Sequence, residues 1–276
     1  MKITVVGLGL IGGSLCKHIK KHTEHKVGGI DINPETIKMA LSQGAIDYEE
    51  KEVGNADITI IGLFPDKCID FCINNASKFK KHSIVIDVSG VKESIVQAVE
   101  PVLAEHEVTF VGAHPMAGRE FSGYEYSLDN LFDNASFIMT PTKNTPQKVI
   151  NLLEDFAYAI NFKKVVIASA EDHDSIIAFT SQLAHVVSNA YIKSPTHQRQ
   201  LGFSAGSFQD LTRVAKLNED MWTPLFLMNK NALCFEIDYI IDRLTEYRNA
   251  IENNEADTLK ELLREGRILK ENTKNL

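Results

Sequence analysis

The side chain best placed to do chemistry in this sequence is His114, within the segment Gly-Ala-His-Pro-Met-Ala-Gly at 112–118. The apolar run 108–113 predicts a strand, and the proline and glycine that follow predict a tight turn. In a doubly wound sheet, ligands bind at the carboxyl ends of the strands. A histidine held there, with an ordinary pKa near neutrality, can take a proton from a hydroxyl group. The alternative is a structural histidine that bonds to the backbone of its own turn.

A glycine pattern at the N-terminus predicts the site of a dinucleotide cofactor. Gly7-Leu-Gly-Leu-Ile-Gly12 follows the β-branched run 2–6 and opens a predicted helix, which is the context in which this pattern holds a pyrophosphate. Asp31 ends the next predicted strand, where its carboxylate can accept hydrogen bonds from a ribose hydroxyl and repel a 2′-phosphate. Because Ile32 and Asn33 offer no cation for that phosphate, we expect NAD rather than NADP.

Apolar runs that alternate with helical patterns predict the fold of residues 1–167. This alternation is typical of βαβ units in a mostly parallel, doubly wound α/β sheet of the Rossmann type. The expected strands are 2–6, 27–30, 58–63, 84–88, 108–113, 137–140 and 164–167, and the expected helices are 11–21, 34–43, 66–79, 92–103 and 146–159. Turns after these strands complete the expected cofactor site, which comprises Gly7, Leu8, Gly9, Leu10, Ile11, Gly12, Asp31, Leu63, Pro65, Ser89 and Gly90.

We expect residues 168–276 to form an all-helical C-terminal domain for substrate binding and dimerisation. Apolar residues recur at helical spacing over 170–192, over 218–253 with a bend near Pro224, and over 256–272. Long apolar helices in so small a domain need further cover. We therefore expect a homodimer, in which a second copy buries their exposed faces.

Charge and cysteine content exclude several classes of partner. The formal net charge is -8 and no basic patch is visible, which argues against nucleic acid and against an anionic membrane surface. No apolar run is long enough to span a bilayer, and the apolar N-terminus is better explained as a buried strand than as a signal peptide. The four cysteines lack zinc-like spacing, so we expect reduced thiols, no metal site and a cytoplasmic location; they are Cys16, Cys68, Cys72 and Cys234.

Together, these motifs resemble the prephenate and arogenate dehydrogenases of tyrosine biosynthesis over nearly the whole chain. The specific matches are His-Pro-Met-Ala-Gly at 114–118 with Glu120 and Ser-Gly-Tyr-Glu-Tyr-Ser at 122–127, then Ser-Gln-Leu-Ala-His at 181–185, Phe-Gln-Asp-Leu-Thr-Arg at 208–213, and Trp222. The resemblance implies oxidative decarboxylation of prephenate with NAD to 4-hydroxyphenylpyruvate, carbon dioxide and NADH.

The resemblance also implies roles for single residues. His114 would accept the proton of the ring hydroxyl as hydride leaves for the nicotinamide. Arg213 would bind a substrate carboxylate, which its guanidinium matches with two parallel hydrogen bonds. His185, with Ser181 one helical turn before it, would hold the substrate. Glu120 would lie near the mouth of the site as a gating residue.

One position departs from the family pattern. The family commonly has a serine just before Val-Lys in the segment after the fourth strand, near the nicotinamide and the catalytic histidine. Here Gly90 occupies that position, and Ser89 stands one residue earlier. We predict an active enzyme in which Ser89 supplies the hydroxyl, with a water molecule or the Gly90 amide as the alternatives.

Three other functions compete with prephenate oxidation. Arogenate, which carries an amino group in place of the side-chain keto group, would undergo the same reaction. A β-hydroxyacid dehydrogenase would usually have a lysine four residues before an asparagine on the long helix, where this chain has His185 and Asn189. An NAD-sensing module without turnover would leave His114 and Arg213 unexplained. Tyrosine is a possible inhibitor that would act at the active site or the dimer interface, because we expect no added regulatory domain.

Overall fold

The computed structural model describes residues 1–119 and 121–273. Two compact units make up the chain, Met1–Asn229 and Lys230–Leu276. No helix in the described part of the chain is both long enough and apolar enough to cross a membrane.

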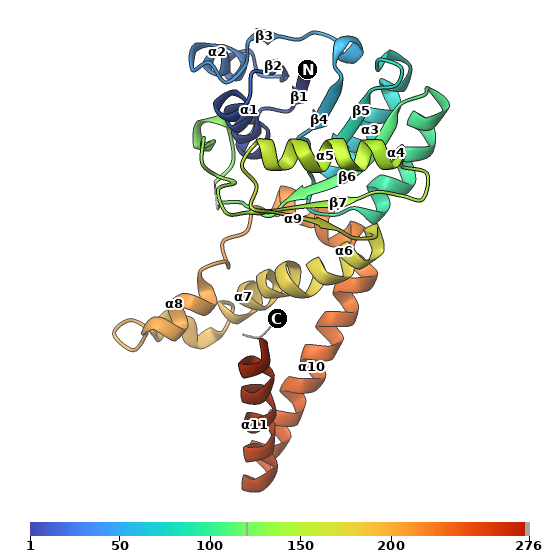
Figure 1. Ribbon diagram of the computed structural model, residues 1–276. Helices are drawn as coiled ribbons and strands as arrows, with labels where there is room; N and C mark the ends of the chain where they lie inside the picture. The colour runs from blue at the N-terminus through green and yellow to red at the C-terminus, as the bar shows by residue number, and fades with distance from the viewer. Residues whose placement is uncertain (120, 274–276) are drawn as a thin grey trace. The chain divides into compact units, whose positions relative to one another are not determined.

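An eight-stranded sheet forms the centre of the first unit (Figure 1). Its order is β3-β2-β1-β4-β5-β6-β7-β8, and every neighbouring pair is parallel except β6 with β7. The strands are β1(Lys2–Val6), β2(Lys26–Ile30), β3(Tyr48–Glu49), β4(Ile58–Ile61), β5(Ile84–Asp87), β6(Thr109–Pro115), β7(Ser136–Thr140) and β8(Lys164–Ile167). The predicted doubly wound sheet is thus confirmed, and the edge strand β3 was missed because two residues carry no periodic signal.

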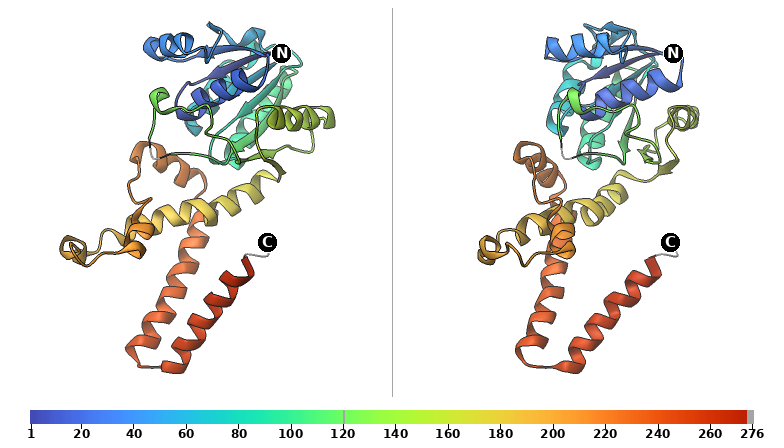
Figure 2. Two further views of the ribbon diagram at one scale, coloured as in Figure 1. Left: turned by 60° about the vertical axis from the view of Figure 1, so that its left-hand side comes forward. Right: turned by 90° about the vertical axis from the view of Figure 1, so that its left-hand side faces the viewer.

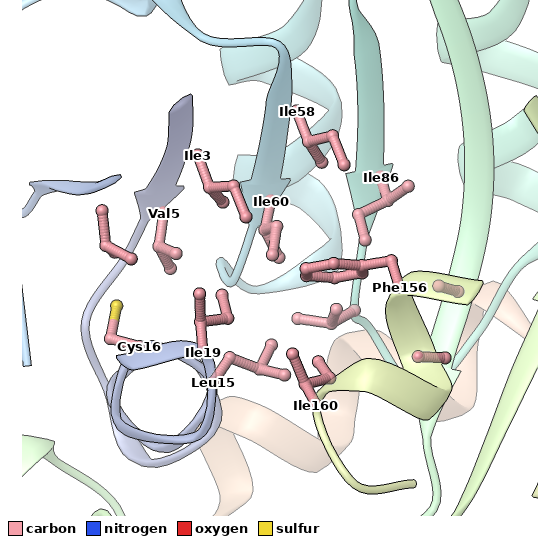
Figure 3. Packing of buried hydrophobic residues seen from close by; sticks show 14 of the residues in the cluster. Ile3, Val5, Leu15, Cys16, Ile19, Ile58, Ile60, Ile86, Phe156 and Ile160 are labelled. Carbon is pink, nitrogen blue, oxygen red and sulfur yellow. The ribbon is translucent and has the colours of Figure 1, made fainter. Parts of the chain in front are cut away.

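Helices cover both faces of this sheet, and each face has its own hydrophobic core. One face carries α1(Leu10–His22), α2(Pro34–Ser42) and α5(Gln147–Ala159), whose apolar side chains pack on residues such as Ile3 and Val5 (Figure 3). The other carries α3(Pro65–Asn74) and α4(Glu93–Glu105), which pack on Val6 and Val85. Successive strand residues point alternately to the two cores, so each face of the sheet needs its own layer of helices.

A single long helix begins the predicted helical region, as expected for 170–192. It comprises α6(Ala170–Ile177), the π-helical segment η4(Ala178–Leu183) and α7(Ala184–Tyr191). Ser169 caps its start, since its hydroxyl oxygen accepts from the Asp172 amide at 3.0 Å. The wide π turn was not predicted from the sequence. Such turns occur frequently at functional sites.

The helix predicted over 218–253 is two helices, and the predicted bend near Pro224 is wrong. Pro224 lies inside α9(Glu219–Met228), and the chain breaks instead at Asn229, whose φ of -109° and ψ of 28° are not helical. The side chain of Asn229 donates to the Asp174 carbonyl and to Gln182 Oε1, both at 2.8 Å. These buried bonds explain why the helix ends there.

The remaining short helices of the first unit are η1(Val53–Asn55), η2(Ala76–Lys78), η3(Tyr124–Tyr126), η5(Pro195–Arg199) and α8(Gly206–Thr212).

The second unit is a pair of helices, α10(Lys230–Glu252) and α11(Ala256–Asn272), joined by a short turn (Figure 2). Tyr247 Oη donates to the Leu262 carbonyl at 3.1 Å and ties the two helices together. Several large apolar side chains on them are more than half exposed: Phe235, Tyr239, Ile241, Leu244, Ile251, Leu263 and Leu269. A pair of helices with so much exposed apolar surface is typical of an interface.

Candidate active site

The glycine loop between β1 and α1 has the geometry that a pyrophosphate needs. Gly7 has φ +82°, and a Cβ built on Gly12 would lie 2.0 Å from the Gly7 carbonyl oxygen, so both positions demand glycine. A Cβ built on Gly9, by contrast, would meet nothing within 4 Å. Gly9 therefore leaves the amino end of α1 open to a ligand, where the helix dipole favours negative charge.

Asp31 lies at the end of β2 and holds the glycine loop in place. One carboxylate oxygen accepts from the Leu8 amide and the other from the Asn33 amide, both at 2.8 Å. Each oxygen keeps a second lone pair, so the carboxylate can still accept from a ribose hydroxyl. Ile32 beside it is fully exposed, which leaves room for the adenosine side of a dinucleotide.

The remaining residues predicted at the cofactor lie at the carboxyl ends of β4 and β5. Leu63 is partly buried and follows β4, whereas Pro65 is buried and begins α3. Ser89 is buried, and its hydroxyl donates to the Leu63 carbonyl at 3.4 Å. Since β1 and β4 are neighbours where the strand order reverses, these turns and the glycine loop meet at the topological switch point, which is where dinucleotides bind in this kind of sheet.

His114 lies in β6, one residue before the strand ends, and pairs in register with Ile138 of β7. The strand thus ends two residues later than predicted, and the histidine belongs to the sheet rather than to a turn. Burial is the largest influence on His114 and holds the pKa of this imidazole well below its ordinary value of 6.5. The imidazole is therefore neutral near pH 7 and can act as a base.

Behind His114, two residues of α6 form a hydrogen-bonded line. His114 Nδ1 lies 2.9 Å from His173 Nε2, and His173 Nδ1 lies 2.7 Å from Asp174 Oδ1. The Asp174 carboxylate also accepts from the amides of Lys92 and Glu93, each at 2.8 Å, at the start of α4. Both His173 and Asp174 are 2% exposed, so solvent does not compete for these bonds.

A buried ion pair supports the same corner of the sheet. Lys92 Nζ bonds to Asp87 Oδ2, and both side chains are fully buried. Asp87 also accepts from the Ser89 amide at 3.0 Å. The pair therefore fixes the segment 88–91, which connects β5 to α4 and passes beside His114.

Gly90 lies directly next to the imidazole of His114. A Cβ built on Gly90 would lie 4.0 Å from His114 Nε2 and 3.5 Å from Leu225 Cδ2, which are ordinary contact distances. A side chain at this position would thus lie beside Nε2. Gly90, the position at which we predict a missing hydroxyl, is therefore within reach of this imidazole.

The two polar residues predicted on the long helix lie in and just after the π turn. His185 Nδ1 lies 2.8 Å from the Ser181 carbonyl oxygen, and the ring of His185 packs on Trp222 with centroids 4.1 Å apart. A carbonyl only accepts, so Nδ1 carries the proton and Nε2 is left to contact a ligand. Trp222 thus packs against a predicted binding residue.

Arg213 follows α8, and its position is fixed from α7. Ser188 Oγ donates to the Leu211 carbonyl at 2.7 Å, and Asn189 Nδ2 donates to the Ala215 carbonyl at 2.9 Å. The two carbonyls lie on either side of Arg213 in the sequence, and both bonds come from α7, the helix that carries His185. Arg213 itself is exposed. Glu120, the predicted gating residue, lies outside the described residues.

Helix α9 connects the two parts of this site. Its Leu225 packs near Gly90, its Trp222 packs on His185, and Gln182 Nε2 donates to the Leu225 carbonyl at 3.2 Å. One helix therefore contributes a side chain near Gly90, beside His114, and another that packs on His185.

One group of possible metal ligands lies elsewhere in the described residues. His18, His22 and Asp133 bring three donor atoms within 4.8 Å of one another. Both ring nitrogens of His18 are already engaged, since Nδ1 faces the Ile160 carbonyl at 3.3 Å and Nε2 accepts from the Phe132 amide at 3.3 Å. We therefore interpret His18 as a core histidine.

Comparison with known proteins places this geometry in a family. A model described as prephenate dehydrogenase, nucleotide-binding domain, matches residues 15–166, and one described as prephenate dehydrogenase, dimerization domain, matches residues 169–265. The chain belongs to the prephenate dehydrogenase family. The resemblance inferred from the His114 segment is thus confirmed, as is a Rossmann-type domain followed by a helical dimerization domain.

Three members of the family illustrate the similarity. The prephenate dehydrogenase of Bacillus subtilis (strain 168) is 32% identical over 268 residues, which are 93% of this chain and 72% of that protein. A crystal structure of prephenate dehydrogenase from A. aeolicus, in complex with hydroxyphenyl propionate and NAD+, has a TM-score of 0.89, 30% identity and coverage of 99% and 98% of the two chains. The Synechocystis arogenate dehydrogenase has a TM-score of 0.85, 25% identity and coverage of 99% and 100%.

Sequence patterns alone did not reveal the two residues behind His114, which are His173 and Asp174. They lie 59 and 60 positions from His114, and no local pattern marks a contact over that distance. The one available signal was the pair itself, since adjacent histidine and aspartate on an otherwise apolar helix face are costly to bury without a partner.

Proposed function

We propose that this protein catalyses the NAD-dependent oxidative decarboxylation of prephenate to 4-hydroxyphenylpyruvate in tyrosine biosynthesis. The observation that carries the proposal is the position of His114 near the carboxyl end of β6. Its Nδ1 is bonded to His173, and its Nε2 lies beside Gly90. Family membership and the similarity to an enzyme solved with NAD+ and a hydroxyphenyl ligand support the same reaction.

The residues of the chain fit NAD. The open amino end of α1 at Gly9 would receive the pyrophosphate, and Asp31 would accept from the ribose hydroxyls. When bound, NAD would serve as the hydride acceptor. The exposed Ile32 offers no charge for a 2′-phosphate, which favours NAD over NADP.

In this proposal His114 is the general base. Nε2 takes the proton of the ring hydroxyl as a hydride leaves the carbon that bears this hydroxyl, and loss of the ring carboxylate as carbon dioxide then gives the aromatic product. Its lowered pKa keeps Nε2 free at neutral pH. A positioned base of this kind contributes about 10²- to 10⁴-fold to the rate.

The substrate is a dianion, and we assign its anchoring to the helical region. Arg213 binds a carboxylate, and His185 with Ser181 contacts the ring or side chain through the open Nε2. Ser89 supplies a hydroxyl near the nicotinamide, and Glu120 gates the site. We also propose that residues 1–167 bind the cofactor and that residues 168–276 bind the substrate and mediate dimerisation.

The first test is NADH formation by the purified protein with NAD and prephenate. We expect turnover in the wild type, and a fall of about 10²- to 10⁴-fold in kcat for His114→Asn with the affinity for NAD unchanged. NAD binding without turnover on prephenate or arogenate would favour a sensor. Turnover on small β-hydroxyacids alone would favour the hydroxyacid dehydrogenases, whose layout is similar.

Arogenate is the second candidate substrate. A structural relative that covers 99% of this chain is an arogenate dehydrogenase. Since His185 Nδ1 faces the Ser181 carbonyl, its Nε2 is left to accept from the arogenate ammonium group. Kinetics with both substrates side by side separates the two, because the preferred one has the higher kcat/KM.

We also propose a homodimer in the cytoplasm. The dimerization-domain match and the exposed apolar residues of α10 and α11 support a second copy, and all four cysteines are free thiols. Light scattering should give twice the 30.8 kDa of one chain; a monomeric mass would contradict this.

We also propose tyrosine as an inhibitor. Competitive inhibition against prephenate would indicate that tyrosine binds at the active site.

A further inference from the structure

The bonds around Asp174 determine where the proton of His173 lies. The two amides at the start of α4 can only donate, and they reach the two carboxylate oxygens at 2.8 Å, one each. The third close contact, from His173 Nδ1 to Asp174 Oδ1 at 2.7 Å, has the length of a charge-assisted hydrogen bond. The carboxylate acts as acceptor in all three, and so His173 Nδ1 carries its proton.

The tautomer of His173 then determines that of His114. A neutral imidazole protonated on Nδ1 has only a lone pair on Nε2. His173 Nε2 lies 2.9 Å from His114 Nδ1, so this contact is a hydrogen bond only if His114 donates. His114 is consequently protonated on Nδ1, and its Nε2, beside Gly90, is the free nitrogen.

We propose that His173, oriented by Asp174, is a positioning residue that holds His114 in the tautomer with Nε2 unprotonated and stabilises the positive charge when Nε2 takes a proton. The consequence for turnover rests on the proposed function, whereas the tautomer does not. The His173 ring links His114 by hydrogen bonds to the Asp174 carboxylate, whose negative charge favours a positive charge on His114. Among the described residues, the other charged group that acts on His114 is Lys92, which is paired with Asp87.

The structure offers a pair of substitutions that separates positioning from packing. His173→Leu removes both nitrogens but fills a similar volume. His173→Gln keeps an amide group that can donate to Asp174 and an oxygen that can accept from His114. His18→Gln is the matched control, since His18 is also buried and bonded on both nitrogens but belongs to the opposite core of the sheet.

The direct test is the tautomer, read by NMR of the full chain labelled with ¹⁵N-histidine, with and without NAD, and assigned with the His114→Asn variant. We expect His114 protonated on Nδ1 in the wild type and a mixture of tautomers in His173→Leu. A wild-type His114 protonated on Nε2 would overturn the inference. This readout needs no substrate, so a wild type with the expected tautomer but no turnover on prephenate would refute the proposed function alone.

The kinetic test uses prephenate and NAD. For His173→Leu we expect kcat to fall about 10²-fold, KM and NAD affinity to stay within about twofold, and the acid limb of the pH profile to move to lower pH. His173→Gln should recover most of kcat, and His18→Gln should match the wild type. Equal losses in both His173 variants with an unmoved acid limb, or wild-type kcat in a folded His173→Leu, would contradict the proposal.

Discussion

Gly90 is the residue at which this chain departs from the usual family pattern, and the structure allows the departure to be reversed. A Cβ at this position makes only ordinary contacts, 3.5 Å from Leu225 and 4.0 Å from His114 Nε2. We expect Gly90→Ser to fold as stably as the wild type, with a hydroxyl that reaches the imidazole.

This substitution tests whether Ser89 replaces the missing hydroxyl. If it does, Ser89→Ala should lower kcat several-fold in the wild type and have less effect in the Gly90→Ser background, because the two sites are coupled. Steady-state kinetics of the two single variants and the double variant measures that coupling. Identical effects of Ser89→Ala in both backgrounds would show that Ser89 is not the substitute.

Lys92 provides the clearest stability prediction at a single residue. Lys92→Met would leave the buried carboxylate of Asp87 with only the Ser89 amide as a partner, since Asp87 Oδ1 already has none among the described residues. We expect the free energy of unfolding to fall by about 3–5 kcal/mol. Urea denaturation measures it.

An exposed ion pair is the control for Lys92. Lys81 pairs with Glu107 on the surface, where its side chain is 70% exposed. Lys81→Met should leave the free energy of unfolding nearly unchanged, because solvent screens an exposed pair. Equal losses for the two lysines would mean that burial does not govern the Lys92 pair.

At the scale of elements, the junction between α9 and α10 depends on one side chain. Asn229→Ala would remove the bonds to the Asp174 carbonyl and to Gln182 Oε1 in a buried place. We expect a loss of about 1–3 kcal/mol in stability and a lower kcat, because Asp174 also orients His173. Asn151→Ala, at an exposed site on α5, should change neither in the same denaturation and rate measurements.

The elements that the sequence predicted well are those with local signals. The glycine spacing at 7–12 and the alternating apolar strands identify the cofactor loop and the sheet without knowledge of tertiary contacts. The break at Asn229 could not be predicted, because the buried partners Asp174 and Gln182 are 55 and 47 positions away. Proline is the usual local signal for a bend in a helix, and for this reason the bend was predicted near Pro224.

The same distinction applies to the candidate site. His114 could be found from its segment, and His185 from its place on an apolar helix near Ser181. Neither His173 nor the buried Lys92 could be assigned, since each acts through a contact between elements. Residues that touch ligands are marked by type and spacing, whereas residues that support them are marked only by the fold.

For the whole molecule, buried histidines predict how stability changes with pH. Burial lowers the pKa of His18 and of His114 below the ordinary value of 6.5, so the unfolded chain binds their protons first as the pH falls. Stability present above about pH 6.5 is therefore lost below it. Paired carboxylates such as Asp57, whose pKa is lowered from 3.8 chiefly by Lys80, contribute to acid sensitivity only at much lower pH.

Urea denaturation of the wild type at about pH 7.5 and about pH 5.5 tests this order. We expect lower stability at the lower pH, and a smaller difference between the two in His18→Gln, which keeps both hydrogen bonds without the titration. Equal stability of the wild type at both values would refute the assignment.

The placement of His114 inside the sheet also determines which parts of the molecule move during a catalytic cycle. Strand β6 is paired with β5 on one edge and with β7 on the other, so its backbone opens only when much of the sheet opens. The proposed base is then stationary on the time scale of turnover, and alignment of the reactants falls to the ligands and the helices around it. Deuterium exchange should be slowest in β6 and faster in α8 and α9.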